Sequence, residues 1–198
     1  MKNDAAARRI IDDREGLVCR WWLNDREISP ADMAHKLTLR NLDMHVNHFT
    51  EIDPMTKQPF ERGSPFISLS AGTVERDVAA QTNYVHRARR TALYFGTDFG
   101  RLTSAYLYYC WVILAPRPAV EIEYLAEEVR DLNAYRHYSP FQTEGEVLAK
   151  IVVGDNHIQR CEKWELSAGS TPWYEQKWTQ PNSRFVSPER LTNVREMI

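Results

Sequence analysis

The sequence lacks the features of secreted, membrane-spanning and disulfide-stabilised proteins. Its only three cysteines, an odd number, are far apart at Cys19, Cys110 and Cys161, so neither a disulfide framework nor a zinc site is expected. The charged N-terminus has no apolar signal-peptide core, and no apolar run approaches the roughly 20 residues that span a bilayer. We therefore expect a cytoplasmic protein with reduced thiols and no membrane partner.

The chain also lacks a strong charge of either sign, internal repeats and low-complexity segments. It has 25 basic and 27 acidic residues and a formal charge of −2, which excludes a general attraction to nucleic acid but not a local basic patch. Its 198 residues fit one compact domain with terminal additions. We expect an N-terminal helix over 1–16, a domain over 17–166 and a C-terminal extension over 167–198 packed on the domain.

Periodicity and capping residues predict a mixture of helices and strands. Ser29-Pro30-Ala31-Asp32 has the residues of a helix start, and an apolar stripe indicates a helix over 73–94. Apolar and alternating runs predict strands over 17–23, 66–70, 104–114 and 155–166, with 104–114 central. In the tail, the aromatic residues are expected to dock on the body: Trp173, Tyr174 and Trp178.

The segment from Tyr138 to Val153, YSPFQTEGEVLAKIVV, contains two carboxylates two residues apart, Glu144 and Glu146, before an apolar run. In a strand these side chains leave the same face, while Val147, Ala149 and Ile151 face the other way into a core. Like charges so close repel unless a cation faces them. The pair is therefore a candidate site. The alternative is a solvated strand end.

Two other strands carry polar residues of interest. Arg20 lies in the middle of the apolar strand predicted over 17–23 and needs a partner or a cleft. Ser68 and Ser70 share one face of the alternating strand 66–70 with Phe66. The alternatives are an edge-strand arginine and an ordinary amphipathic strand.

Two histidines raise the question of a metal. His45 and His48 are three residues apart on a predicted helix, but no third ligand has a suitable spacing. We expect surface or packing histidines and no metal.

The order of Arg20, Phe66-Ile67-Ser68-Leu69-Ser70 and Glu144-Gly145-Glu146-Val147-Leu148 resembles the mono-ADP-ribosyltransferases of the Arg-Ser-Glu, cholera-toxin-like type. The likeness covers roughly residues 17–158. Leu69 replaces the threonine that is commoner in the Ser-x-Ser motif, and two tryptophans follow Arg20, which makes the first motif the loosest match. The resemblance implies an α+β fold, an ADP-ribosyltransferase-like split β-sandwich of mostly antiparallel strands with flanking helices.

The resemblance also implies roles for individual residues, with NAD as the substrate. Glu146 would stabilise the oxocarbenium-like transition state at the nicotinamide ribose, and Ser68 would orient it. Arg20 would bind the NAD phosphates, with Ser70 in a supporting role. Glu144 would position or deprotonate the nucleophile.

The loop before the carboxylates corresponds by position to the family's substrate-recognition loop. Tyr138, Phe141 and Gln142 are the candidates there, although the two aromatic residues can equally be loop anchors. Gln142-Thr143-Glu144 forms a Gln-x-Glu motif that overlaps the Glu-x-Glu of Glu144-Gly145-Glu146, so two registers remain open. The apolar residues after Glu146 favour Glu144 and Glu146 as the functional pair.

The resemblance implies an enzyme that transfers ADP-ribose to a macromolecular acceptor, acting as a toxin of the toxin–antitoxin, phage-defence or effector type. A Glu-x-Glu motif points to a protein acceptor, and an antitoxin or immunity protein is an expected partner. The first alternative is modification of RNA or DNA bases, since the basic residues at 86–90 and 136–137 could contact phosphate. The others are an NAD glycohydrolase and a non-enzymatic binding module.

Overall fold

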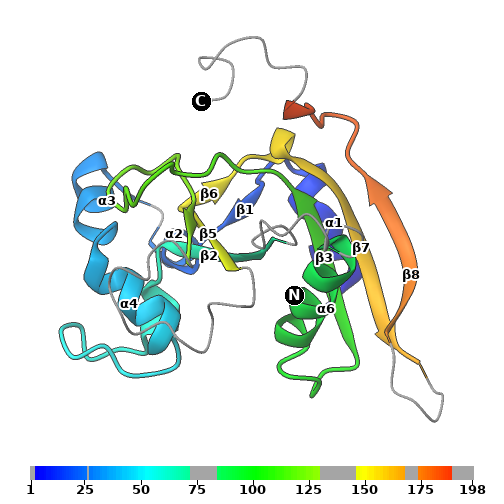
Figure 1. Cartoon of the computed structure of the whole chain (residues 1–198), viewed down its shortest axis with the longest axis horizontal. Helices are drawn as coiled ribbons and strands as arrows, with labels where there is room; N and C mark the ends of the chain where they lie inside the picture. Colours follow the sequence, from blue (N-terminus) through cyan, green and yellow to red (C-terminus); the bar gives the residue numbers. More distant parts are fainter. Residues whose placement is uncertain (1–2, 26, 72–83, 130–145, 168–173, 189–198) are drawn as a thin grey trace. The chain divides into compact units, whose positions relative to one another are not determined.

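The computed structural model describes residues 3–25, 27–71, 84–129, 146–167 and 174–188 (Figure 1). The chain forms two compact units. Unit 1 comprises Met1–Leu17, Val78–Trp111 and Val153–Ile198, and unit 2 comprises Val18–Asp77 and Val112–Val152. The short strands β1 (Leu17–Val18) and β6 (Val152–Val153) lie where the chain passes from one unit to the other. The division into 1–16, 17–166 and 167–198 stays a prediction.

Unit 1 contains an antiparallel sheet with the strand order β3-β7-β8. Its strands are β3 (Ser104–Cys110), β7 (Ile158–Leu166) and β8 (Tyr174–Pro181), and its helices are α1 (Asp4–Asp12), α6 (Tyr84–Gly96) and the 3₁₀ turn η4 (Asp155–His157). The prediction that 104–114 is the central strand is wrong, because β7 is central in the described part of this sheet. Strand β8 was not predicted.

The helices of unit 1 pack on this sheet through both apolar and polar contacts. Leu93 of α6 lies in a buried cluster with Ala105, Leu107 and Trp164. On α1, Asp4 accepts hydrogen bonds from the hydroxyl of Tyr106 at 2.6 Å and from Nε1 of Trp178 at 3.1 Å. The prediction that tail aromatics dock on the body is therefore confirmed for Trp178.

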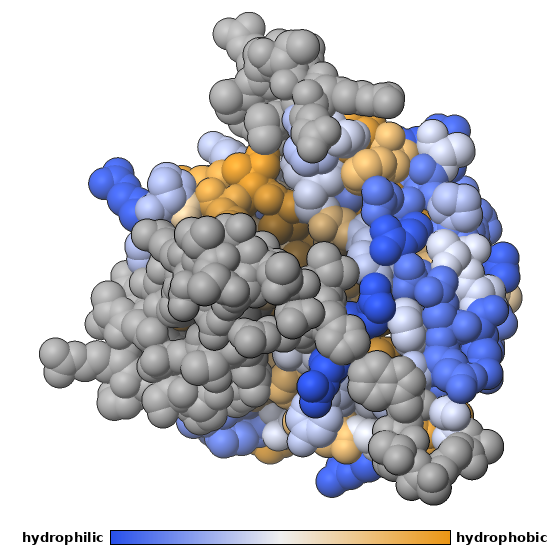
Figure 2. Space-filling view, turned by 45° about the vertical axis from the view of Figure 1, so that its right-hand side comes forward, coloured by the Kyte–Doolittle hydropathy of each residue, from blue (hydrophilic) through white to orange (hydrophobic). Residues whose placement is uncertain are grey.

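The outer strand β8 exposes mainly polar side chains, including Glu175, Gln176 and Lys177. Hydrophilic residues cover much of the right-hand side of the view in Figure 2. An edge strand that carries charged side chains is protected from pairing with another chain. The part of the tail that contains Trp173 lies outside the described residues.

Unit 2 holds a second antiparallel sheet, with the strand order β2-β5-β4. The strands are β2 (Phe66–Ser70), β4 (Glu127–Glu128) and β5 (Glu146–Lys150), and the helices are α2 (Arg20–Asn24), α3 (Pro30–Lys36), α4 (Leu39–Asn47) and α5 (Phe60–Gly63). Helix α3 starts as predicted, because Ser29 and Asp32 form a capping box. The Ser29 side chain accepts a hydrogen bond from the Asp32 amide, and the Asp32 carboxylate accepts one from the Ser29 amide.

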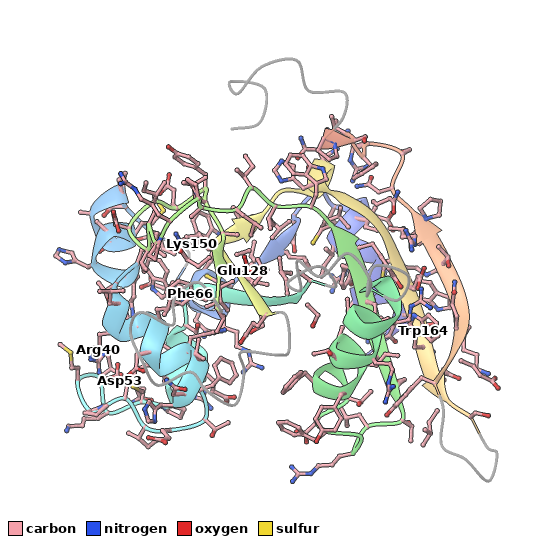
Figure 3. All side chains as sticks on the ribbon, viewed as in Figure 1. Arg40, Asp53, Phe66, Glu128, Lys150 and Trp164 are labelled. Carbon is pink, nitrogen blue, oxygen red and sulfur yellow. The ribbon has the colours of Figure 1, made fainter. Side chains whose placement is uncertain are left out.

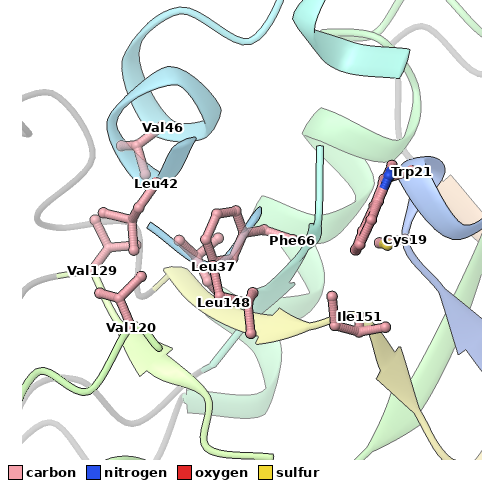
Figure 4. Close-up of a cluster of buried hydrophobic side chains, with 10 residues drawn as sticks. All are labelled: Cys19, Trp21, Leu37, Leu42, Val46, Phe66, Val120, Val129, Leu148 and Ile151. Atoms are coloured by element: carbon pink, nitrogen blue, oxygen red, sulfur yellow. The ribbon is translucent and has the colours of Figure 1, made fainter. Parts of the chain in front are cut away.

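The core of unit 2 joins the helices to the sheet (Figure 4). Its buried side chains are Cys19, Trp21, Leu37, Leu42, Val46, Phe66, Val120, Val129, Leu148 and Ile151. Strand β5 is buried from Val147 to Lys150, whereas strict alternation would bury only one of its faces. Leu148, on the face of Glu146, is fully buried, so the predicted polar face is polar only at its end.

A buried ion pair lies beside this core. Nζ of Lys150 donates to Oε1 of Glu127 at 2.7 Å and to the carbonyl oxygens of Ala119 and Ile122 at 2.7 and 2.9 Å. Both charged side chains are almost inaccessible to solvent. Figure 3 shows Lys150 at the end of β5, in the strand pair that also holds Phe66. The partners satisfy charges that would otherwise be costly to bury.

The predicted α+β class, with antiparallel strands and flanking helices, is confirmed.

Figure 3 also labels Arg40 and Asp53, whose ion pair joins α4 to the loop that leads to α5. Among the described residues, no helix combines the length and the apolar character needed to cross a bilayer.

Candidate functional site

Strands β2 and β5, which carry two of the three motifs, are hydrogen-bonded neighbours. Ser70 lies directly opposite Glu146 and Ser68 opposite Leu148 in the antiparallel register. Side chains of directly opposed residues project from the same face of a sheet, and alternate residues along a strand share a face. Ser68, Ser70 and Glu146 therefore share one face, as the alternation predicted for the two serines. Glu146 is half-buried and Ser68 is exposed.

A histidine on α4 contacts the serine strand directly. Nε2 of His45 lies 2.9 Å from Oγ of Ser68, and Nδ1 lies 2.7 Å from Oγ of Ser64. Phe49 meets the imidazole edge-on, with ring centroids 5.2 Å apart, and the Phe66 ring is tilted against it at 5.6 Å. His45 thus joins Ser64, two positions before β2, to the first serine of the motif.

His45 is held in its neutral form. Only 6% of the residue is exposed, and burial together with the positive charge of Arg20 lowers its pKa from 6.5 to about 4. A neutral imidazole has one donor and one acceptor nitrogen, and each serine hydroxyl can serve either of them. The arrangement fixes the direction of the Ser68 hydroxyl while leaving that serine accessible.

Sequence reasoning left His45 among surface or packing histidines, and the structure shows that it is buried and bonded to the site. Leu42 and Val46, its neighbours along α4, are core residues. A polar side chain on the apolar face of a helix must find partners, which is the signal that could have identified it. His48 instead forms a surface contact with Glu51 at 3.0 Å.

Arg20 does not lie in a strand, and the prediction of a strand over 17–23 is wrong. The chain leaves β1 after Val18, and Arg20 is the first residue of α2, where Sγ of Cys19 accepts a hydrogen bond from the Trp22 amide. Trp21 is buried in the core. Burial of this tryptophan and the cap outweigh the β-propensity of the segment.

The guanidinium of Arg20 lies in unit 2 with the other described site residues, and 56% of the side chain is exposed. Its Nη1 forms an ion pair with Oε2 of Glu61 at 3.0 Å. Its Cζ lies 5.4 Å from the centroid of the Phe49 ring. Phe49 thus contacts both Arg20 and His45.

Several predicted site residues lie outside the described part of the chain: Glu144, Tyr138, Phe141 and Gln142. The choice between the two registers accordingly stays a prediction. Within the described ranges, no group of three or more His, Cys, Asp or Glu side chains could hold a metal ion.

No known protein family and no curated protein matches this chain in sequence. Among solved structures, EcPltA aligns with 91% of this chain and with 82% of its own length, at a TM-score of 0.49 and 12% sequence identity. At this level of likeness, the residues of the site and not the neighbour are the basis for a functional conclusion.

Proposed function

We propose that the protein is an NAD-dependent mono-ADP-ribosyltransferase that modifies a macromolecule, with a protein as the favoured acceptor. The observation that carries the proposal is the antiparallel pairing of β2 with β5. It brings Ser68, Ser70 and Glu146 to one face although they are separated by more than seventy residues of sequence. If the family resemblance is right, the serine motif and the carboxylate motif must be adjacent in space. The order of the motifs along the chain does not by itself provide this.

The chemistry of the site fits the cleavage of NAD. The bond between nicotinamide and ribose breaks through a positively charged, oxocarbenium-like transition state, and a fixed carboxylate stabilises a charge that exists only there. Glu146 has this role in the proposal. Nicotinamide leaves with the bonding electrons, the acceptor atom attacks the ribose carbon, and the proton of the acceptor passes to Glu144 as general base.

The diphosphate of NAD needs a cation that is accessible to solvent. Arg20 is half exposed, and its planar guanidinium suits two-point contact with phosphate oxygens. Phe49 and His45 form the link between this arginine and Ser68 on the sheet that carries Glu146. Tyr138, Phe141 and Gln142 contact the acceptor in the proposal, and a toxin role with an antitoxin or immunity partner remains part of it.

The purified protein should be incubated with NAD labelled in the adenylate part and with a cell lysate. Label on protein supports the proposal. Label on RNA or DNA instead moves the acceptor to nucleic acid, and free ADP-ribose alone indicates an NAD glycohydrolase. The absence of any NAD turnover refutes the enzymatic proposal and leaves a binding module.

Substitution of the proposed carboxylates tests the site itself. Glu146→Gln should abolish nicotinamide release while leaving the fold intact, whereas Glu144→Gln should reduce transfer more than NAD hydrolysis. Glu123, an exposed carboxylate of unit 2, provides a matched control as Glu123→Gln. Full NAD turnover by Glu146→Gln contradicts the assignment. If Glu144→Gln loses NAD hydrolysis and Glu146→Gln does not, Glu144 is the catalytic carboxylate.

A further inference from the structure

The side chain of Arg20 must be held in one conformation to bind a phosphate, but an exposed arginine side chain is flexible. Fixing such a side chain for binding costs rotamer entropy. A site gains affinity when this cost is met before the ligand arrives. The contacts that hold the guanidinium in the ligand-free protein therefore bear on how well it binds a phosphate.

Glu61 contacts the guanidinium at one end. Oε2 of Glu61 lies 3.0 Å from Nη1 of Arg20, and 38% of the Glu61 side chain is exposed. Among the described residues, this ion pair uses Nη1 and involves neither Nε nor Nη2. The guanidinium presents its donors in a fixed fork. An anion on Nη1 therefore leaves the Nε and Nη2 edge for a second acceptor.

The backbone of Glu61 is itself fixed relative to Arg20, which distinguishes this pair from an ordinary surface ion pair. The amide of Trp21 donates to the carbonyl of Ser64 at 3.2 Å, and Nδ2 of Asn24 donates to the carbonyl of Arg62 at 2.7 Å. Phe60, the residue before Glu61, is buried. These two hydrogen bonds join α2 to α5 and to Ser64, the residue that follows α5, and so fix the backbone of Glu61 relative to Arg20.

Phe49 contacts the guanidinium through its ring. The 5.4 Å between Cζ and the ring centroid lies within the range of a cation–π contact. Phe49 is in turn packed edge-on against the buried ring of His45. Glu61 therefore holds the arginine at Nη1, and the Phe49 ring contacts the guanidinium. The same ring also contacts His45, the partner of Ser68.

We infer that Glu61 is a positioning residue, which holds Arg20 so that the Nε and Nη2 edge receives the diphosphate of NAD. This inference rests on the proposed function. Glu61 does not touch the substrate, so its effect passes entirely through Arg20. It should therefore change the affinity for NAD and leave the rate of the chemical step unaltered.

The test compares Glu61→Ala with Glu61→Gln, measuring Kd for NAD by calorimetry and KM and kcat by nicotinamide release. Exposed ion pairs contribute roughly 0.2 to 1 kcal/mol, so Glu61→Ala should raise Kd and KM by about two- to fivefold with kcat unchanged. Glu61→Gln retains an acceptor for the Nη1 hydrogen and should give intermediate values. Glu51→Ala is the control, because Glu51 is an exposed, paired carboxylate of the same unit.

A double-variant cycle separates positioning from general effects. In an Arg20→Ala background, Glu61→Ala should have no further effect on NAD affinity. A loss that persists there overturns the inference, as does a lower Kd in either Glu61 variant, which would make the carboxylate a competitor of the diphosphate. If the unaltered protein binds no NAD, the proposed function itself fails. NAD binding that depends on Arg20 but not on Glu61 refutes only the inference.

Discussion

Acidification should destabilise unit 2 through His45. Its pKa falls from 6.5 in the unfolded chain to about 4 in the folded protein, so folding favours the neutral ring. This contribution is complete above pH 6.5 and is lost as the pH falls toward 4. At about 1.36 kcal/mol per unit, the full difference is about 3 kcal/mol. Roughly 2 kcal/mol of it should disappear between pH 7 and pH 4.5.

The assay is urea denaturation at several pH values, with His45→Gln and His45→Asn compared with the unaltered protein. Neither amide titrates in this range, so the stability gap between the unaltered protein and each variant should shrink as the pH falls. A gap that is the same at pH 7 and pH 4.5 refutes the assignment of the buried, neutral histidine.

The two amides also separate the two contacts of the ring. The Gln amide lies near the place of Nε2 and can retain the contact with Ser68, whereas the Asn amide lies near the place of Nδ1 and can retain the contact with Ser64. If the Ser68 contact matters for NAD turnover, His45→Gln should keep more activity than His45→Asn. The reverse order would assign His45 a purely structural role at Ser64.

Two further predictions concern groups outside the proposed site. Lys150→Met should destabilise the protein by about 3 to 5 kcal/mol, because Glu127 is then left buried and unpaired. The double variant Lys150→Met/Glu127→Leu should recover most of this loss in melting temperature, and a double variant as unstable as Lys150→Met would contradict the reasoning. For Asp4, hydrogen bonds from Tyr106 and Lys163 lower the carboxyl pKa from 3.8 to about 2. Its stabilising contribution should therefore persist until the pH falls below 3.8, and Tyr106→Phe should raise the titration midpoint seen by carboxyl carbon NMR.

Local chemistry was enough to predict several elements of this fold. The capping box at Ser29 fixes where α3 begins, and the alternation of residues 66–70 correctly predicted strand β2. In both cases the deciding interactions lie within a few residues of each other. Such short-range signals can be recognised from the sequence without knowledge of tertiary contacts.

The errors have a common physical origin in contacts between distant residues. Residues 17–23 have high β-propensity, yet only Leu17 and Val18 form a strand, and burial of Trp21 in the core of unit 2 stabilises a helix from Arg20 onward. Strand β8 has a polar, proline-ended sequence, and its pairing with β7 defines it. Lys150 lies on the face that alternation assigned to polar residues, yet it is buried, because Glu127 and the carbonyls of Ala119 and Ile122 satisfy its ammonium group.

The same distinction applies to the two registers of the carboxylate segment. A strand has a side-chain period of two, so a slip of one residue moves every side chain to the other face, whereas a slip of two moves none. Faces therefore cannot distinguish Glu144 from Glu146 as the catalytic carboxylate. Glu146 lies opposite Ser70 in the described pairing with β2, whereas Glu144 lies outside the described residues, so the choice between them stays a prediction. A charged transition state requires a fixed carboxylate, so the comparison of Glu146→Gln with Glu144→Gln identifies the residue that supplies it.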